Sequence, residues 1–382
     1  MFNNIPKNWT KTKLEMAANI EYGTRIVKNS SVGSKYYVYG GGDKTFKTDE
    51  YNRENALVIA RFGMSPKCTR FVKGKFFLND SGLTVSTNNE EILDQEFLNW
   101  QLIFLNDLIY SLGKGVAQKN LNVGKFKQID IIIPPTLKEQ KEIVEILKTM
   151  NTIISLREKC IKDAQNLIPA MFQEMFASYI TKKADYVPIG SVTNDTTQIN
   201  PSKIFKSEFY YIDISSINND TGIIETPKKI NINNIPSRAR KIVQTNDVLI
   251  SMTRPYLKGF SIVPEYLNGQ IASTGFSVLR AIPEKLSPLY LNAYTKTNLF
   301  IEQLIPKMKG ASYPAVRDLD VRNVKIPLPS IELQEQFAER IEEINSYIQT
   351  QQKELENAKQ MFQSLLYHAF TGELTRRVYG KD

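Results

Sequence analysis

Two long stretches of the chain carry apolar residues that are spaced alternately four and three positions apart. The first series is Ile143, Leu147, Met150, Ile154, Ile161, Ala164, Ile168, Met171 and Met175; adding 194 to each number gives Phe337, Ile341, Ile344, Ile348, Leu355, Ala358, Phe362, Leu365 and Ala369. A spacing kept over this length is typical of one face of a helix and not of a strand or a loop. The pattern predicts two helices of about 40 residues, each about 60 Å long.

These apolar stripes could pack against their own globular domains or against each other. We favour mutual packing as a coiled coil, because the stripe is narrow and occurs twice in register. Each copy is interrupted once, by Arg157 and by Gln351, at equivalent positions. A polar residue there either fixes the register of the pair or lies in a locally splayed, solvated seam.

Each predicted helix follows a strand-like run that ends in proline, at residues 129–135 and again at 324–329. Thr136 and Glu139 form a capping-box pattern at the first entry. At the second, Ser330 can cap and Glu332 places negative charge in the first turn. Pro169 has Gln363 as its counterpart and predicts a kink or early fraying of the first helix.

The segments before the helices mix apolar strand-like runs, such as residues 56–60 and 247–251, with connections rich in Gly, Asn, Tyr and basic residues. They are interpreted as mixed α/β globular domains, so the fold class is α+β with a pseudo-two-fold internal repeat. The predicted division is a first domain over 1–136, a helix over 137–180, a second domain over 181–330, and a helix with a tail over 331–382.

The chain carries a net charge of +9, but this charge is not spread evenly. Residues 137–178 are neutral and residues 331–372 carry −4, so the remaining residues carry +13. The globular segments are therefore the surfaces on which a polyanion such as nucleic acid would bind.

Basic and aromatic residues interleave in these segments, in patterns that suit phosphate contacts and base reading. Just before each strand-like run, a Lys-Gly turn recurs at an offset of 195, at residues 114–121 and 309–316. Glycine there would let the backbone approach DNA closely, although a tight turn needed only for chain reversal is an equal alternative. The candidate DNA-binding residues are Lys35, Tyr37, Tyr39, Gly41, Lys44, Arg61, Lys67, Arg70, Lys114, Gln118, Lys119, Arg238, Arg240, Lys241, Arg254, Lys258, Lys309, Ser312, Tyr313 and Arg317.

Residues for catalysis or metal binding are scarce. His368 is the single histidine, and Cys68 and Cys160, both expected to be reduced thiols, are the two cysteines, so triads and thiolate zinc sites are excluded. Residues 40–45 lack the spacing of a phosphate loop, and no glycine fingerprint for a dinucleotide or S-adenosylmethionine follows a strand. Asp130, Glu139 and Lys141 resemble a nuclease cluster only superficially, because Glu139 is explained as a cap.

The first residues lack the apolar core of a signal peptide, and no run approaches the roughly 20 apolar residues of a membrane span. We therefore expect a cytoplasmic protein.

With the repeat established, the chain resembles the specificity subunits of type I restriction-modification enzymes, known as HsdS, over nearly its whole length. The matching segments are residues 39–42, 121–122, 134–140, 210–215, 246–251, 253–255, 311–314, 328–334 and 369–374. Residues 115–118 depart from the small-residue and proline run of many members, which leaves that loop's geometry open.

The resemblance implies two target recognition domains that each read half of a bipartite DNA site, separated by paired antiparallel helices that set the spacing. It also implies a non-catalytic chain that assembles with two modification subunits and with restriction subunits. S-adenosylmethionine, ATP and Mg²⁺ would then be bound only by those partners, and no cofactor or metal by this chain.

Two other interpretations compete with this one. The chain could be a self-contained DNA methyltransferase or nuclease, which the missing motifs argue against. It could also be a coiled-coil scaffold whose domains bind protein rather than DNA. The target sequence itself cannot be read from these residues, because base readout depends on loop positions.

Overall fold

The computed structural model describes residues 5–28, 33–116, 118–182 and 186–374. The chain forms two compact units, one of residues 1–158 with 353–382 and the other of residues 159–352. Each unit therefore contains one globular part and about half of each long helix. The division predicted from the sequence treats the two globular domains and the two helices as four separate parts. That division stays a prediction.

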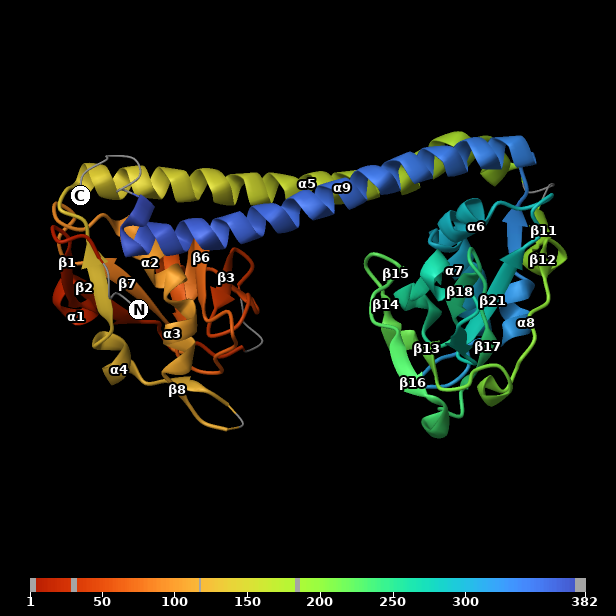
Figure 1. Cartoon of the computed structure of the whole chain (residues 1–382), viewed down its shortest axis with the longest axis horizontal. Helices are drawn as coiled ribbons and strands as arrows, with labels where there is room; N and C mark the ends of the chain where they lie inside the picture. The colour runs from red at the N-terminus through yellow and green to blue at the C-terminus, as the bar shows by residue number, and fades with distance from the viewer. Residues whose placement is uncertain (1–4, 29–32, 117, 183–185, 375–382) are drawn as a thin grey trace. The chain divides into compact units, whose positions relative to one another are not determined.

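The two long helices are α5, Leu137–Thr181, and α9, Ile331–Thr371, of 45 and 41 residues (Figure 1). In the first unit, Met150 and Ile154 of α5 pack with Ala358 of α9. In the second unit, the rings of Phe172 and Phe337 lie 5.6 Å apart. Because the early part of one helix meets the late part of the other in both units, the pair is antiparallel, as expected. Helix α5 continues through Pro169 to Thr181, so the early fraying expected at this proline was a wrong prediction, and the alternative of a kink there stays a prediction.

The first turns of the helices are capped as the sequence suggested, with one difference. The Thr136 hydroxyl accepts a hydrogen bond from the Glu139 amide at 3.2 Å, and the Ser330 hydroxyl accepts one from the Leu333 amide at 3.4 Å. The Glu139 carboxylate, however, accepts a hydrogen bond from the Trp9 indole at 3.0 Å. The second half of the capping box is thus replaced by a bond to the start of the chain.

The predicted seam residues are all buried or half-buried, but the stripe serves two purposes. Ile143 and Leu147 belong to the core of the first globular part, and Phe337 and Ile341 to that of the second. A separate helix-to-helix cluster forms in the first unit around Met150, with Leu355 and Phe362 among its members. The prediction that the whole stripe packs against the other helix was therefore too simple. The residues at the start of each helix pack into the core of a globular part. The other seam residues, Ile161, Ile168, Ile344 and Ile348, lie on the halves of the helices in the second unit.

Arg157, which interrupts the seam, forms an ion pair across it. Its guanidinium lies 3.2 Å from the Glu354 carboxylate, and nearby Lys359 lies 2.8 Å from Glu158. The polar position is thus bridged between the helices, which fits the first of the two alternatives for it.

The first globular part is built on a six-stranded sheet in the order β2-β7-β5-β6-β3-β4, antiparallel except between β3 and β6. Its strands are β2 Ala18–Tyr22, β3 Tyr36–Tyr39, β4 Lys47–Thr48, β5 Arg53–Ala60, β6 Thr69–Leu78 and β7 Gly82–Thr87. The helices α2 and α3 follow the sheet, and β1 pairs antiparallel with β10 at the entry to α5. The remaining bounds are β1 Thr10–Lys13, α1 Leu14–Ala17, α2 Gln95–Phe104, α3 Asn106–Ser111, β8 Gly113–Lys114, β9 Asn120–Leu121, α4 Val123–Lys127 and β10 Asp130–Ile133.

The second globular part has two four-stranded sheets, in the orders β12-β21-β18-β19 and β16-β13-β20-β17, and a short pair of β11 with β22 at the entry to α9. The predicted strand at 247–251 is β18, and the Pro-terminated runs are β10 and β22. The bounds are β11 Tyr186–Pro188, β12 Thr193–Asn194, β13 Glu208–Ile212, β14 Ile217–Asn218, β15 Ile223–Ile224, β16 Lys228–Asn231, β17 Ala239–Ile242, β18 Val248–Ser251, β19 Phe260–Ile262, β20 Ile271–Ser273, β21 Phe276–Ala281, α6 Pro288–Thr295, α7 Asn298–Leu304, α8 Asp318–Arg322 and β22 Lys325–Pro327. The fold class is therefore α+β, as predicted.

Candidate nucleic-acid interface

The repeated Lys-Gly turns form the same hairpin in both units. Lys114 pairs with Asn120 between β8 and β9, and Lys309 pairs with Ala315 as an antiparallel bridge, at the offset of 195. Gly115 and Gly310 have φ values of +117° and +101°, which side-chain-bearing residues rarely adopt. The two Lys-Gly turns are therefore similar in structure as well as in sequence. Ala117, within the first turn, lies outside the described residues.

Each hairpin is bonded to the loop that follows a buried strand of its unit. In the first unit, the Leu121 amide donates to the Arg61 carbonyl at 2.8 Å and the Met64 amide to the Lys119 carbonyl at 2.9 Å. In the second, the Val316 amide donates to the Met252 carbonyl at 3.0 Å and the Arg254 amide to the Pro314 carbonyl at 2.7 Å. The loops after β5 and β18 and the two hairpins therefore make matched surfaces.

In the first unit several predicted residues meet at this surface. Arg70 donates from its guanidinium to the carbonyls of Gly41 and Gly42, the former at 2.7 Å, and burial lowers its pKa. The Arg61 guanidinium lies 4.4 Å from the centre of the Phe62 ring. Arg70 thus holds the glycine loop, while Arg61 lies over an aromatic ring at a cation–π distance.

The remaining candidates of the first unit lie mostly on the surface. Lys35, Lys67, Lys114 and Gln118 are exposed, and Lys119 lies 4.0 Å from the centre of the Tyr110 ring. Tyr37 is exposed and its ring is flanked by Lys44. Tyr39 instead packs edge-on against Phe76 in a small core cluster. Its ring is therefore engaged inside the domain.

In the second unit Arg254 joins the loop to the hairpin. Its side chain donates to the Ser312 carbonyl at 2.7 Å and lies 4.5 Å from the centre of the Tyr313 ring. Lys258 donates to the Lys296 carbonyl at 2.8 Å and to the Asn298 amide oxygen at 3.2 Å. Lys309, Ser312 and Tyr313 are exposed. The hairpin tip, rather than Arg254 or Lys258, is thus the open part of this surface.

Other basic candidates in the second unit are occupied by internal contacts. Lys241 is only 7% exposed and lies 3.4 Å from the Asp318 carboxylate. Arg240 donates to the Ala239 carbonyl at 2.7 Å, and Arg317 lies 3.0 Å from the Asp320 carboxylate. Arg238 is exposed. Burial of Lys241 makes it the weakest DNA-binding candidate, because its ammonium already has a carboxylate partner.

Sequence reasoning missed part of the basic and aromatic surface. Lys47 lies 4.7 Å from the centre of the Tyr37 ring, on the side chain that Lys44 also approaches. Lys75 lies 4.5 Å from the centre of the Tyr51 ring. These pairs come from strands β3, β4 and β6 and the segment before β5, so sequence spacing does not reveal them.

The residues that resemble a nuclease cluster are held in structural contacts. The Asp130 carboxylate lies 2.6 Å from Lys13 and 3.0 Å from Lys11, and these two ammonium groups lower its pKa. Glu139 receives the Trp9 hydrogen bond, and His368 lies 2.7 Å from the Glu373 carboxylate. Within residues 5–374, leaving aside the undescribed gaps, no group of three or more His, Cys, Asp and Glu is placed to hold a metal ion.

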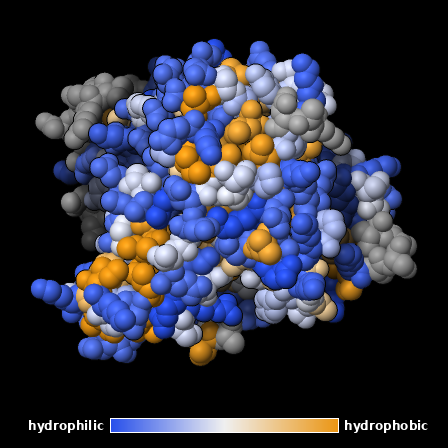
Figure 2. Space-filling model, turned by 90° about the vertical axis from the view of Figure 1, so that its right-hand side faces the viewer, coloured by the Kyte–Doolittle hydropathy of each residue, from blue (hydrophilic) through white to orange (hydrophobic). Residues whose placement is uncertain are grey.

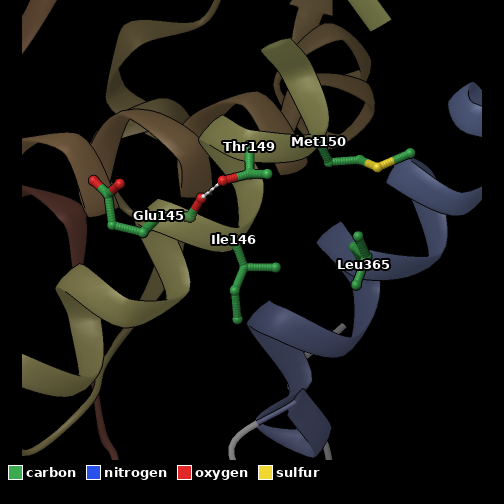
Figure 3. A pocket seen from close by; sticks show the side chains of 5 residues that line it. All are labelled: Glu145, Ile146, Thr149, Met150 and Leu365. Carbon is green, nitrogen blue, oxygen red and sulfur yellow. Dashed lines mark hydrogen bonds between the residues drawn. The ribbon is translucent and has the colours of Figure 1, made fainter. Parts of the chain in front are cut away.

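Two shallow grooves lie on the long helices, one in each unit. The first, of about 340 Å³, is lined by Glu145, Ile146, Thr149 and Met150 of α5 and by Leu365 of α9 (Figure 3). The second, of about 510 Å³, includes Ile344 and Tyr347 of α9 and Leu167 of α5. Thr149 and Met150 correspond to Glu343 and Ile344 under the offset of 194, so two lining positions of the grooves are equivalent in the repeat.

None of the helices among the described residues is both long enough and apolar enough to cross a membrane.

Comparison with known proteins gives a consistent result for both halves of the chain. The family model described as the type I restriction modification DNA specificity domain matches residues 6–165 and again residues 185–360. The MjaVIII specificity subunit of Methanocaldococcus jannaschii, a type I restriction enzyme subunit, is 24% identical over 79% of this chain and 76% of its own length. The EcoBI specificity subunit of Escherichia coli is 24% identical over 64% of this chain and 59% of its own length.

A solved structure has the same fold. The crystal structure of the type I restriction-modification S subunit from M. genitalium matches 96% of this chain and 97% of its own length, with a TM-score of 0.53 and 17% identity. Its likeness supports the architecture of two mixed domains and two long helices. The doubled domain match, which covers more than half of the chain, shows that this chain belongs to the family of type I restriction-modification DNA specificity subunits.

Proposed function

We propose that this chain selects the DNA target of a type I restriction-modification complex, and that each globular part reads one half of a bipartite site. The observation that carries the proposal is the doubled specificity domain, at residues 6–165 and 185–360. In each copy the same hairpin is bonded to the loop after a buried strand. Two matched surfaces on one chain suit a target with two separate halves.

The distribution of charge supports DNA as the ligand. The residues outside the helical segments carry +13, whereas the helical segments carry −4. Figure 2 shows a largely hydrophilic face with small, separate hydrophobic patches. A basic, polar surface attracts phosphates from a distance and loses affinity as salt rises. A scaffold that binds only protein would not need its positive charge to be concentrated outside the helical segments.

We further propose that the long helices dock two modification subunits, and that restriction subunits join this assembly. The related grooves on α5 and α9 offer each modification subunit an equivalent surface. In Figure 3, Ile146 of α5 and Leu365 of α9 line the first groove. On this proposal S-adenosylmethionine, ATP and Mg²⁺ act in the partners, and this chain supplies recognition without catalysis.

The target role is tested by co-expressing the chain with its modification subunit and mapping methylated bases across the host genome. We expect one bipartite motif, which disappears without this chain. Purified chain alone, with S-adenosylmethionine or Mg²⁺ and DNA, should neither methylate nor cleave. Activity of the chain alone would favour a self-contained enzyme, and a motif that does not depend on this chain would refute the proposal.

Docking is tested with Thr149→Arg and Glu343→Arg, which place a large cation at equivalent points of the two grooves. Each single variant should bind one modification subunit instead of two, and the double variant none, by native mass spectrometry. Gln360→Arg, at an exposed position of α9 outside both linings, is the matched control. Normal stoichiometry in the double variant would refute docking at the grooves.

A further inference from the structure

The two hairpins pair their strands at equivalent positions but carry different side chains at one tip position. Gln118 of the first corresponds to Tyr313 of the second at the offset of 195. A Cβ at Gly115 would lie 2.1 Å from the Gln118 carbonyl oxygen, and a Cβ at Gly310 would lie 3.2 Å from the Tyr313 carbonyl oxygen. The carbonyl group of the tip residue therefore lies close to the glycine in both units. The side chains of the two tip residues differ.

Both tip side chains are open to solvent. Gln118 is exposed, and Tyr313 is 69% exposed. No core cluster of the described residues includes Tyr313. Tyrosine combines a large apolar ring with a polar hydroxyl and is enriched at interfaces, so this exposed ring is available to a ligand.

Arg254 holds this ring in place. Its backbone is left-handed, with φ +49°, its amide donates to the Pro314 carbonyl at 2.7 Å, and its side chain donates to the Ser312 carbonyl at 2.7 Å. The guanidinium lies 4.5 Å from the centre of the Tyr313 ring, a cation–π distance. Its Nε is buried and has no hydrogen-bond partner among the described atoms. With these donors turned inward, Arg254 is poorly placed to read a guanine edge with a bidentate fork.

We infer that Gln118 and Tyr313 are the equivalent base-reading residues of the two domains, and that Arg254 is a positioning residue for Tyr313. The inference rests on the proposed function. The Gln118 amide offers one donor and one acceptor edge, which match adenine in the major groove. The Tyr313 ring, with one face covered by Arg254, contacts a thymine methyl through its apolar edge. One scaffold thereby reads one half-site by hydrogen bonds and the other by apolar contact.

The test uses the chain assembled with its modification subunit and measures methylation at every base of the motif. Tyr313→Ala should relax the preference at one position of one half-site by about 5- to 150-fold, which corresponds to the cost of one mismatched base pair. Tyr313→Phe should keep it, because the ring remains. Gln118→Ala should relax one position of the other half-site. Tyr266→Ala, at another tyrosine with 61% exposure and outside the hairpin, is the control and should change nothing.

The positioning role of Arg254 has its own readout. Arg254→Lys keeps the charge but loses the planar stack, so it should relax the same base position as Tyr313→Ala while the salt dependence of DNA binding stays the same. The double variant should be no worse than Tyr313→Ala alone, because both changes remove one element. A direct phosphate or base contact by Arg254 would instead make the two effects add.

Failure of this inference is distinguishable from failure of the proposed function. An active complex whose motif is unchanged in Tyr313→Ala, or changed in the same half-site by Gln118→Ala, overturns the inference and leaves the function intact. A wild-type chain that directs no methylation motif overturns the function itself. Thermal melts of each variant separate loss of folding from loss of reading, and Tyr313→Phe keeps the test valid if Tyr313→Ala is unstable.

Discussion

A buried glutamine in the first turn of each long helix should determine how firmly the helix is attached to its globular part. Gln334 of α9 has no exposed surface; its side-chain oxygen accepts a hydrogen bond from the Ser287 amide at 2.9 Å and its nitrogen donates to the Pro329 carbonyl at 2.9 Å. Gln140 of α5 does the same with the Asp94 amide at 2.8 Å and the Ile92 carbonyl at 2.8 Å. Asp94 and Ser287 directly precede α2 and α6.

Gln334→Leu keeps roughly the side-chain volume and removes these hydrogen bonds. It leaves at least the Ser287 amide and the Pro329 carbonyl without their partner in a buried place, at about 1–3 kcal/mol for each group. We therefore expect the free energy of unfolding of the second unit to fall by about 2–6 kcal/mol. Gln349→Leu, at an exposed site of the same helix within the second unit, should change it by less than about 0.5 kcal/mol.

The two tryptophans make the assay selective, because Trp9 and Trp100 both lie in the first unit. In urea, Gln140→Leu should shift the transition seen by tryptophan fluorescence. Gln334→Leu should shift the circular dichroism transition, and hydrogen exchange should quicken around Ser287 but not around Asp94. A Gln334→Leu variant that unfolds like Gln349→Leu, or that loosens the Asp94 region instead, would refute this reasoning.

Three further predictions follow from local contacts. The Arg317 side chain and backbone amide lower the pKa of Asp320 to about 2. The ionised carboxylate therefore stabilises the fold at pH values above the unfolded-state pKa, which is near 3.9. Asp320→Asn should lower stability at pH 7, and the difference from wild type in urea melts should shrink as the pH falls from about 4 towards 2. Burial raises the pKa of the Cys68 thiol to about 11, whereas Cys160 is exposed. Iodoacetamide at pH 7.5 should therefore modify Cys160 and spare Cys68 until the protein unfolds. Rapid labelling of Cys68 in the native protein, measured by mass spectrometry, would contradict this prediction. Lys44→Ala and Lys47→Ala should each weaken DNA binding by the assembled complex equally on all sequences and reduce the salt slope by about 1, whereas a changed motif would mean that these lysines read bases.

The parts of the fold that were predictable are those whose signal is local. The long helices, their hydroxyl caps at Thr136 and Ser330, and the Pro-terminated strands before them each depend on residues within one or two turns. The continuation of α5 through Pro169 was not predictable, because neighbouring packing outweighs the missing backbone hydrogen bond. Phe172 and Phe176 lie just outside the predicted stripe, yet they are fully buried against Tyr290 of α6.

The candidate interface was predictable as a region but not residue by residue. Lysine and arginine look equivalent in a sequence, and their partners lie far along the chain. Lys241 meets Asp318, and Arg70 meets the carbonyls of Gly41 and Gly42. Such side chains hold loops in place, while Lys114 and Lys309 remain exposed. The count of basic residues therefore overestimates the number available to phosphates.

The two copies of the repeat share some residues and differ at others, and these two sets affect stability and base preference differently. The two units share what fixes the backbone: the buried glutamine, the glycine with positive φ and the hairpin pairing. They differ at the exposed tip, where Gln118 and Tyr313 stand. A change in the shared set alters stability first, because it leaves buried polar groups unpaired. A change at the tip costs little folding energy, so it can alter base preference alone, and one scaffold can thereby come to read two different half-sites.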